Sequence, residues 1–289
     1  GLMDARAADP LTDMLAKETG IIALITDEDA GRAATYPVIL ADSLVPDWRD
    51  PQILAQFSRK SGDMISLKAE DRPDWSGHIT LCTSGTTGMS RCFVHDNFGI
   101  AEQFKSLFRL TEDSDRWIRD DVREKVLAFI PWHHIFGFFV CFILPQVLGS
   151  TMVIPMKPSP EAILQACQGS GVTQLVAIPA VWNGIARAVK KRFTEATGQT
   201  EVEFDELIEL SLSYQKAGVD LPPPIAGVLG MIRSQLFGET LHLGVSGGGP
   251  VLPEALRTIN GLGYHLVNGY GMTEIGIFSV VISEDVDDR

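Results

Sequence analysis

The sequence predicts an α/β fold in which helices are layered on largely parallel β-sheets. Two observations carry this prediction. Short apolar runs alternate with longer amphipathic stretches along the chain, which is the pattern of strands connected by crossover helices. The chain has 289 residues, 45% of them hydrophobic, which is enough to bury a large core as one big domain or two smaller ones.

The predicted strands are the short apolar runs, and the predicted helices are the amphipathic stretches between them. In chain order we expect strands over 21–26, 37–40, 79–82, 92–95, 126–130, 151–154, 174–178, 241–245, 264–267 and 277–282. We expect helices from 96 onward, over 134–148, 160–168 and 180–192, and from 253 onward. Residues 201–236 are predicted to be a helical insertion, broken into two helices by the prolines at 222–224.

Charge and cysteine content narrow the class of protein. A net charge of −13 argues against a nucleic-acid partner, because duplex binding needs a basic face. The four cysteines show neither Cys-x-x-Cys spacing nor a histidine partner pattern, so we expect reduced thiols in a cytoplasmic protein.

One stretch of the sequence is apolar enough to raise the question of a membrane span. Residues 126–156 contain no Asp, Glu, Lys or Arg, but their longest clean apolar run, 135–144, is half of the ~20 residues that a spanning helix needs. We therefore expect no transmembrane span.

A loop rich in glycine and hydroxyl groups directly follows the apolar run 79–82. Residues 83–91 are Thr-Ser-Gly-Thr-Thr-Gly-Met-Ser-Arg. Glycine lets the backbone approach an anion closely, and successive N–H groups and hydroxyls donate to phosphoryl oxygens. Arg91 adds a cation at the end of the loop. The sequence therefore predicts a phosphate-binding loop, with a simple Ser/Thr/Gly surface turn as the alternative.

This loop resembles the signature of the adenylate-forming superfamily, which includes acyl-CoA synthetases, peptide-synthetase adenylation domains and luciferases. The family has Lys where this chain has Arg91. Residues 131–137 are similar to the family's Pro-x-x-His-x-x-Gly element, and residues 267–274 are similar to its Tyr-Gly-x-Thr-Glu element. Between them, residues 245–250 resemble the glycine turn against which adenine lies. One such motif is a weak signal, but four in the family's order over 83–274 are a strong one.

The resemblance implies an ATP site built from these motifs. The ATP-binding residues it implies are Thr83, Ser84, Gly85, Thr86, Thr87, Gly88, Gly247, Gly248, Gly249, Asn268, Gly269, Tyr270 and Gly271. Ser84, Thr86 and Thr87, with Arg91, would hold the β- and γ-phosphates. Tyr270 would stack on adenine, which needs a flat apolar face. The alternative for Tyr270 is a core aromatic.

The same resemblance implies four catalytic residues: Arg91, His134, Thr273 and Glu274. His134 would sit where the carboxylate meets the phosphate, and Thr273 would donate its hydroxyl to the α-phosphate. Glu274 would bind Mg²⁺, which prefers carboxylate and phosphate oxygens. The alternatives are a core histidine, a helix N-cap and a helix-start glutamate, respectively.

The reaction implied is ATP-dependent activation of a carboxylic acid to an acyl-adenylate, followed by thioester formation with CoA. The cofactors would be ATP, Mg²⁺ and CoA, and the enzyme an acid–thiol ligase of the acyl-CoA synthetase type. The insertion at 201–236 is similar to the long-chain branch and favours a fatty acid. Transfer to the phosphopantetheine thiol of a carrier protein stays open, as does a non-catalytic nucleotide or acyl binder. An oligomer is compatible with the sequence.

A serine hydrolase is the remote alternative. Residues 244–248 fit Gly-x-Ser-x-Gly, with Ser246 as the nucleophile between a strand and a helix. That fold requires an acid and then a histidine after the serine. His265 follows Ser246 with no Asp between them, and Glu254 comes too soon after it.

The resemblance covers only the middle of the family's large N-terminal domain. In the family, an aspartate for the ribose hydroxyls, a hinge and a mobile C-terminal domain with an adenylation lysine follow the last motif. We therefore interpret the chain as a fragment that is poorly active by itself. We expect a partial N-terminal subdomain, an incomplete α/β layer, over 1–77, and a nucleotide- and acyl-binding α/β core over 78–289.

Overall fold

The computed structural model describes residues 24–26, 38–40, 78–82, 91–112, 119, 122–155 and 159–281. The chain divides into two compact units, one extending to Asp96 and the other beginning at Asn97. Each unit is described by itself. The domain boundary expected after residue 77 stays a prediction, because residues 41–77 lie outside the described residues.

The first unit contains two pairs of short strands. Strands β1 (Leu24–Thr26) and β2 (Val38–Leu40) pair in parallel. Strands β3 (His78–Cys82) and β4 (Cys92–Asp96) pair antiparallel, with Cys82 opposite Cys92. The predicted phosphate loop therefore connects two paired antiparallel strands, although residues 83–90 themselves lie outside the described residues.

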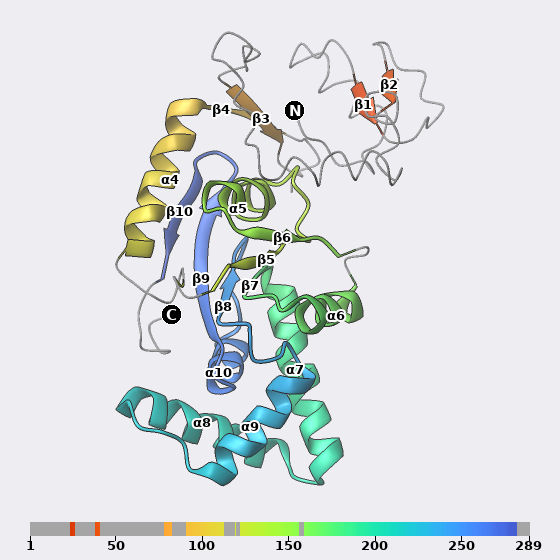
Figure 1. Cartoon of the computed structure of the whole chain (residues 1–289), viewed down its shortest axis with the longest axis vertical. Coiled ribbons are helices and arrows are strands. Elements are labelled where there is room, and N and C mark those ends of the chain that lie inside the picture. The colour runs from red at the N-terminus through yellow and green to blue at the C-terminus, as the bar shows by residue number, and fades with distance from the viewer. Residues whose placement is uncertain are drawn as a thin grey trace. The chain divides into compact units, whose positions relative to one another are not determined.

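The second unit is built on a six-stranded sheet with the order β10-β9-β8-β7-β5-β6 (Figure 1). Its strands are β5 (Lys125–Leu127), β6 (Thr151–Val153), β7 (Gln174–Ala177), β8 (Leu243–Ser246), β9 (His265–Met272) and β10 (Gly276–Val280). All neighbouring strands are parallel except β9 and β10, which are antiparallel. The predicted α/β fold with a largely parallel sheet is confirmed.

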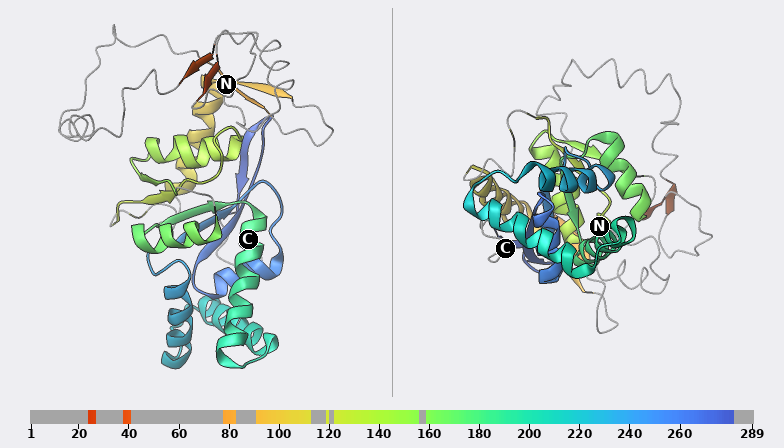
Figure 2. Two further views of the ribbon diagram at one scale, coloured as in Figure 1. Left: turned by 90° about the vertical axis from the view of Figure 1, so that its right-hand side faces the viewer. Right: turned by 90° about the horizontal axis from the view of Figure 1, so that it is seen from below.

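The helices occupy the segments that the sequence predicts. They are α4 (Asn97–Glu112), the π-helix η2 (Gly137–Ile143), α5 (Leu144–Val147), α6 (Pro160–Ser170), α7 (Pro179–Thr197), α8 (Glu201–Ala217), α9 (Pro223–Gln235) and α10 (Pro253–Gly261). The predicted break at the three prolines is confirmed, because α9 begins at Pro223. Helices α8 and α9 extend from one end of the sheet beside the C-terminal half of α7 (Figures 1 and 2).

Local capping explains where two of these helices begin and end. Ser159 accepts a hydrogen bond from the Ala162 N–H at the start of α6, and Gly171 ends that helix with a left-handed φ of 63°. Thr200 and Glu203 form a reciprocal capping box at the start of α8. These signals are local in the sequence, which is why the helices could be predicted from it.

The two faces of the sheet are covered by different helices. Leu175 and Ala177 of β7 join a core cluster with α6, α7, α8, α9 and α10. Val176, which points to the opposite face, joins a smaller cluster with Cys141 of η2. Burial raises the pKa of the Cys141 thiol to about 12, so this cysteine is a packing residue rather than a nucleophile. Among the described helices, none is long and apolar enough to cross a membrane.

The strand order changes direction at β5. The chain passes from β5 to β6 on one side and then returns through α6 to β7 on the other side of β5. Open α/β sheets bind their ligands at the carboxyl ends of the strands beside such a switch point. The topology therefore predicts a ligand site among the residues that follow β5 and β7.

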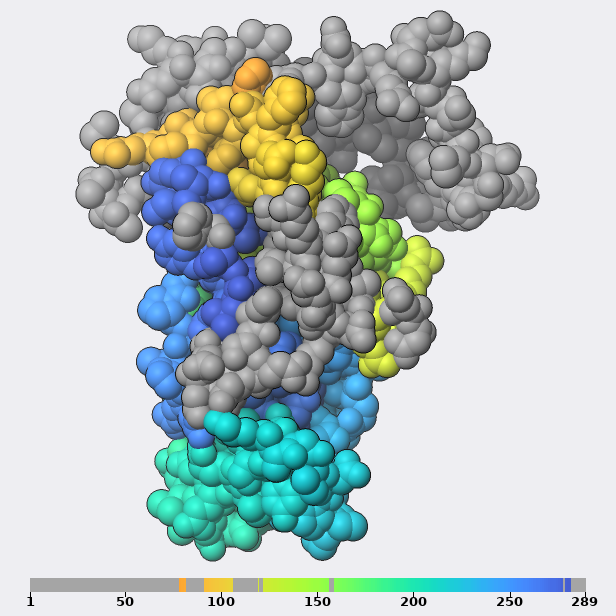
Figure 3. Space-filling view, turned by 90° about the vertical axis from the view of Figure 1, so that its left-hand side faces the viewer, coloured from red at the N-terminus to blue at the C-terminus, as the bar shows by residue number. Residues whose placement is uncertain are grey.

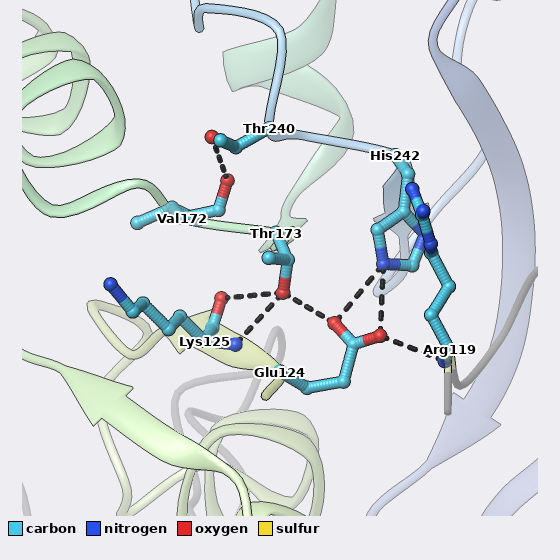
Figure 4. Close-up of polar contacts among 7 residues, drawn as sticks. All are labelled: Arg119, Glu124, Lys125, Val172, Thr173, Thr240 and His242. Atoms are coloured by element: carbon cyan, nitrogen blue, oxygen red, sulfur yellow. Dashed lines mark hydrogen bonds and ion pairs between the residues drawn. The ribbon is translucent and has the colours of Figure 1, made fainter. Parts of the chain in front are cut away.

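A buried glutamate joins the amino ends of β5, β7 and β8 (Figure 4). Glu124 is 5% exposed and accepts hydrogen bonds from the Thr173 hydroxyl and the Arg119 N–H. His242 Nε2 lies 3.0 Å from both carboxylate oxygens. Burial alone raises the pKa of the Glu124 carboxyl, but these hydrogen bonds outweigh it and hold the pKa below its ordinary value of 4.5. The ionised Glu124 therefore stabilises the folded state at the amino ends of these strands.

We predict that Glu124→Gln lowers the free energy of unfolding at pH 7 by about 1–3 kcal/mol, because buried donors lose a charged acceptor. Since the folded pKa lies below the unfolded one, the stabilisation is fully present above pH 4.5 and is lost as the pH falls through the folded value. Urea denaturation at a series of pH values measures this difference. The exposed Glu206→Gln is the control, and an equal effect of both changes would contradict the prediction.

Candidate functional site

A cavity of about 320 Å³ lies at the carboxyl ends of the central strands. Its walls come from three segments that are far apart in the sequence and that the motif analysis had singled out. These lining residues include His134, Phe136, Gly247, Gly248, Gly269, Tyr270, Gly271 and Thr273. We call this the reaction cavity. It brings together seven of the residues assigned to the site from the sequence.

The first segment follows β5 and turns directly into a helix. The His134 N–H donates to the Pro131 carbonyl over 3.2 Å, and the Phe138 N–H donates to the His134 carbonyl over 2.8 Å. Gly137 packs so closely on this turn that a Cβ there would lie 2.8 Å from the Ile130 carbonyl oxygen and nearer still to that of Pro131. The glycine of the Pro-x-x-His-x-x-Gly element therefore allows the turn that places His134 in the cavity wall.

The second segment is the glycine turn after β8. A Cβ on Gly247 would lie 2.5 Å from the Phe136 ring, so glycine lets that ring close one side of the cavity. Gly248 has a φ of 87°, a conformation that favours glycine. The strand leading into the turn is fixed by Trp182, whose indole N–H donates to the Val245 carbonyl over 3.3 Å.

The third segment is the hairpin of β9 and β10. The sequence placed the end of its strand at residue 267, but β9 continues to Met272, because residues 269–272 pair with β10 after the pairing with β8 ends at Asn268. Tyr270 lines the cavity and is 56% exposed, which leaves it accessible to a flat ligand. Tyr270 is therefore not a core aromatic.

The turn between β9 and β10 carries Thr273 and Glu274. It is a turn between strands rather than a helix start, so the helix-cap alternatives for both residues are wrong. The Gln103 side chain of α4 holds the turn, donating to the Ile275 carbonyl over 2.8 Å and accepting from the Ile277 N–H over 3.2 Å. In the space-filling view, α4 lies against this part of the chain (Figure 3).

Gln103 is a residue that sequence reasoning missed. It lies 172 residues before its acceptor Ile275, in a helix that was assigned no role. Gly276 opposite it has a φ of 84°, and a Cβ there would collide with the Gln103 amide. A glycine two residues after the Tyr-Gly-x-Thr-Glu element was the one local signal that something packs closely on the turn.

Other predicted site residues lie outside the cavity wall. Gly249, Asn268 and Glu274 do not line it, although each is next in sequence to a residue that does. Arg91 is exposed at the start of β4 in the first unit, and residues 83–88 lie outside the described residues. Within the described residues, no group of three or more His, Cys, Asp or Glu side chains could hold a metal by itself. The exposed Glu274 carboxylate suits an Mg²⁺ ion whose other ligands are phosphate oxygens.

Ser246 does not have the environment of a nucleophile. Ser246 is fully buried, and its hydroxyl oxygen has no hydrogen-bond partner among the described residues. A nucleophilic serine needs an adjacent general base and access to substrate. The geometry thus gives no support to the serine hydrolase alternative.

Residues 12–289 match the AMP-binding enzyme family, and the chain belongs to that family. The chain is 29% identical to a 4-coumarate–CoA ligase of Halorhodospira halophila, over 56% of this chain and 42% of that protein. It is 25% identical to long-chain-fatty-acid–CoA ligase 1 of Saccharomyces cerevisiae, over 89% of this chain and 41% of that protein. It therefore spans less than half of the length of these curated relatives. The resemblance drawn from the four motifs is confirmed.

Solved structures support the same fold. The inhibitor-bound N-terminal domain of FACL13 from Mycobacterium tuberculosis matches with a TM-score of 0.57 at 19% identity, covering 98% of this chain and 59% of that one. The Klebsiella oxytoca NpsA N-terminal subdomain, in complex with 3-hydroxybenzoyl-AMSN, matches with a TM-score of 0.57 at 16% identity, covering 99% of this chain and 57% of that one. These structures are N-terminal domains, as the motif analysis implies for this chain.

We predict that two glycines of the third segment respond differently to alanine. A Cβ on Gly271 would lie 2.7 Å from the Gly276 carbonyl oxygen, whereas a Cβ on Gly269 would lie an ordinary 3.6 Å from that of Ser246. Gly271→Ala should lower the free energy of unfolding by about 1–3 kcal/mol, because backbone must move. Gly269→Ala should stay within about 0.5 kcal/mol of the parent. Urea denaturation compares the two, and equal effects would refute the packing described.

Proposed function

We propose that the complete protein activates a carboxylic acid with ATP to form an acyl-adenylate, and then transfers the acyl group to the thiol of CoA. One observation carries this proposal: the reaction cavity joins the histidine, glycine-turn and tyrosine motifs of an AMP-binding enzyme in one space. The curated relatives are CoA ligases, which supports an acid–thiol ligase.

In this proposal a carboxylate oxygen attacks the α-phosphorus of ATP and pyrophosphate leaves. The thiol sulfur of CoA then attacks the acyl carbonyl carbon, and AMP leaves with the electron pair of the broken C–O bond. Charge builds on phosphoryl oxygens in the first step, so positioning and electrostatic stabilisation supply most of the catalysis. The exposed Tyr270 offers a stacking surface for adenine, and the open space at Gly248, where a Cβ would meet no atom within 4 Å, leaves room for the base.

The polar residues around the cavity divide the remaining work. His134, in the cavity wall, would orient the carboxylate, and the Thr273 hydroxyl would donate to an α-phosphate oxygen. Glu274, next to Thr273, would hold Mg²⁺, which when bound neutralises phosphate charge. Arg91 and the hydroxyls of Ser84, Thr86 and Thr87 would hold the β- and γ-phosphates.

We further propose that the acid is a fatty acid. Beyond its glycines, the reaction cavity is lined mainly by apolar side chains such as Ile135, Val140 and Leu144. The long helical insertion of α8 and α9 and the similarity to a long-chain-fatty-acid–CoA ligase support this choice.

A carrier-protein thiol is the second candidate acceptor, because a matching structure is an adenylation–PCP di-domain. We also propose a cytoplasmic location, since the described cysteines are free thiols.

The test is carboxylate-dependent pyrophosphate–ATP exchange by the complete protein, with hydroxamate trapping of acyl-adenylates from acids of increasing chain length. We expect exchange and trapped product with at least one fatty acid, and release of AMP when CoA is added. ATP binding without exchange for any acid would identify a non-catalytic binder instead. Product formation only with a phosphopantetheinylated carrier would identify the second acceptor.

We predict that Arg91→Ala weakens ATP binding by the complete protein about 10-fold or more, because one charged hydrogen bond to phosphate is lost. Arg91→Lys should keep or improve turnover, since it retains the charge as the family's usual cation. Isothermal titration with ATP and the exchange rate measure the two effects. An unchanged ATP affinity in Arg91→Ala would contradict the assignment of the loop.

A further inference from the structure

Helix α4 contacts two of the three segments that form the reaction cavity, through two adjacent residues. Gln103 bonds to the backbone beside the turn that carries Thr273. Phe104, which is 7% exposed, stacks on the buried Phe139 of η2, with the ring centroids 5.6 Å apart and the ring planes 16° from parallel. Helix η2 follows the turn of His134, and α4 lies beside β10 (Figure 1). Helix α4 therefore connects the segment of His134 with the segment of Thr273.

The contact of Gln103 uses both ends of its side-chain amide. Its Nε2 donates to the Ile275 carbonyl over 2.8 Å, and its Oε1 accepts from the Ile277 N–H over 3.2 Å. A glutamine can make both bonds at once because its amide carries a donor and an acceptor. Gly276, between the two bonded residues, has a φ of 84°, and a Cβ there would collide with the amide. The contact therefore requires a bare backbone at 276 and an intact amide at 103.

Burial of side chains contributes little to fixing the turn between β9 and β10. Of its three residues, Glu274 is exposed and Ile275 is 46% exposed, whereas Thr273 lines the reaction cavity. The Ile275 N–H donates to the Met272 carbonyl over 3.2 Å and closes the turn upon itself. A turn with few buried apolar contacts opens easily unless hydrogen bonds hold it to the rest of the fold. The position of Thr273 therefore depends on bonds such as those of Gln103.

We propose that Gln103 is a positioning residue for acyl-adenylate formation, because it ties the turn of Thr273 to the helix that also packs on the segment of His134. This inference rests on the proposed function, in which His134 orients the carboxylate and Thr273 donates to the α-phosphate. The attack requires these two groups at a fixed separation, and a displacement of about 1 Å can cost roughly 100-fold in rate. Gln103 does not line the reaction cavity, so it acts through the turn and not on the substrate.

The experiment compares Gln103→Leu with Gln215→Leu in the complete protein. Gln215 lies on α8, away from the reaction cavity, and its Nε2 donates to the Asn260 carbonyl over 3.0 Å, so it controls for the loss of a long-range glutamine bond. Carboxylate-dependent pyrophosphate–ATP exchange gives kcat and KM, with each kcat divided by the folded fraction from circular dichroism. We expect Gln103→Leu to lower kcat about 10-fold or more. KM for ATP should stay within about threefold, because Tyr270 lies outside the turn, and Gln215→Leu should change neither.

Amide hydrogen–deuterium exchange gives a readout that needs no catalysis. We expect Gln103→Leu to speed deuterium uptake by the Ile277 N–H about 10-fold or more, because its acceptor is lost and the turn opens more often. Gln215→Leu should leave this amide unchanged. If Gln103→Leu fails to fold, Gln103→Glu takes its place. It keeps the acceptor for Ile277 but loses the donor to Ile275, so we expect changes in the same direction.

The outcomes separate this inference from the proposed function. An unchanged kcat in Gln103→Leu, with an active parent, would overturn the positioning role and leave the ligase function standing, even if deuterium uptake at the turn is faster. Activation of no acid by the unmodified complete protein would overturn the ligase function, and deuterium uptake would then decide alone whether Gln103 holds the turn. Equal losses of kcat in Gln103→Leu and Gln215→Leu would also overturn the positioning role.

Discussion

The candidate site depends on three close contacts that leave no room for a side chain. At Gly137, Gly247 and Gly271 an added Cβ would overlap a carbonyl oxygen or an aromatic ring. Each contact fixes one of the three segments that form the reaction cavity. The glycines of the three motifs are therefore steric requirements of the fold.

The two ends of the sheet have different tasks. At the amino ends of β5, β7 and β8, the Glu124 carboxylate gathers the donors of Thr173 and Arg119 and contacts His242 (Figure 4). At the carboxyl ends lie two cavities whose linings share Ile130 and Ile178.

The sequence predicted what local patterns determine. Caps at Ser159 and Thr200 and the proline break before α9 are local signals, and the helices beside them were predicted within a few residues. Three of the four motifs, at 131–137, 245–250 and 267–274, predicted segments that meet at the cavity. The extension of β9 to Met272 and the role of Gln103 could not be predicted, because both depend on partners distant in the chain. The register of β9 with β10 and the position of α4 exist only in the assembled unit.

The contact between His242 and Glu124 joins residues that are 118 positions apart in the chain. Parallel strands cannot pair until the helices between them have been traversed, so this contact closes a long loop at a high cost in chain entropy. Helices α6 and α8 carry their own local caps, whereas the central strands wait for their distant neighbours. During synthesis on the ribosome, this part of the sheet therefore stays incomplete until β8 has emerged, and the apolar edge of β7 remains open to incorrect partners until then.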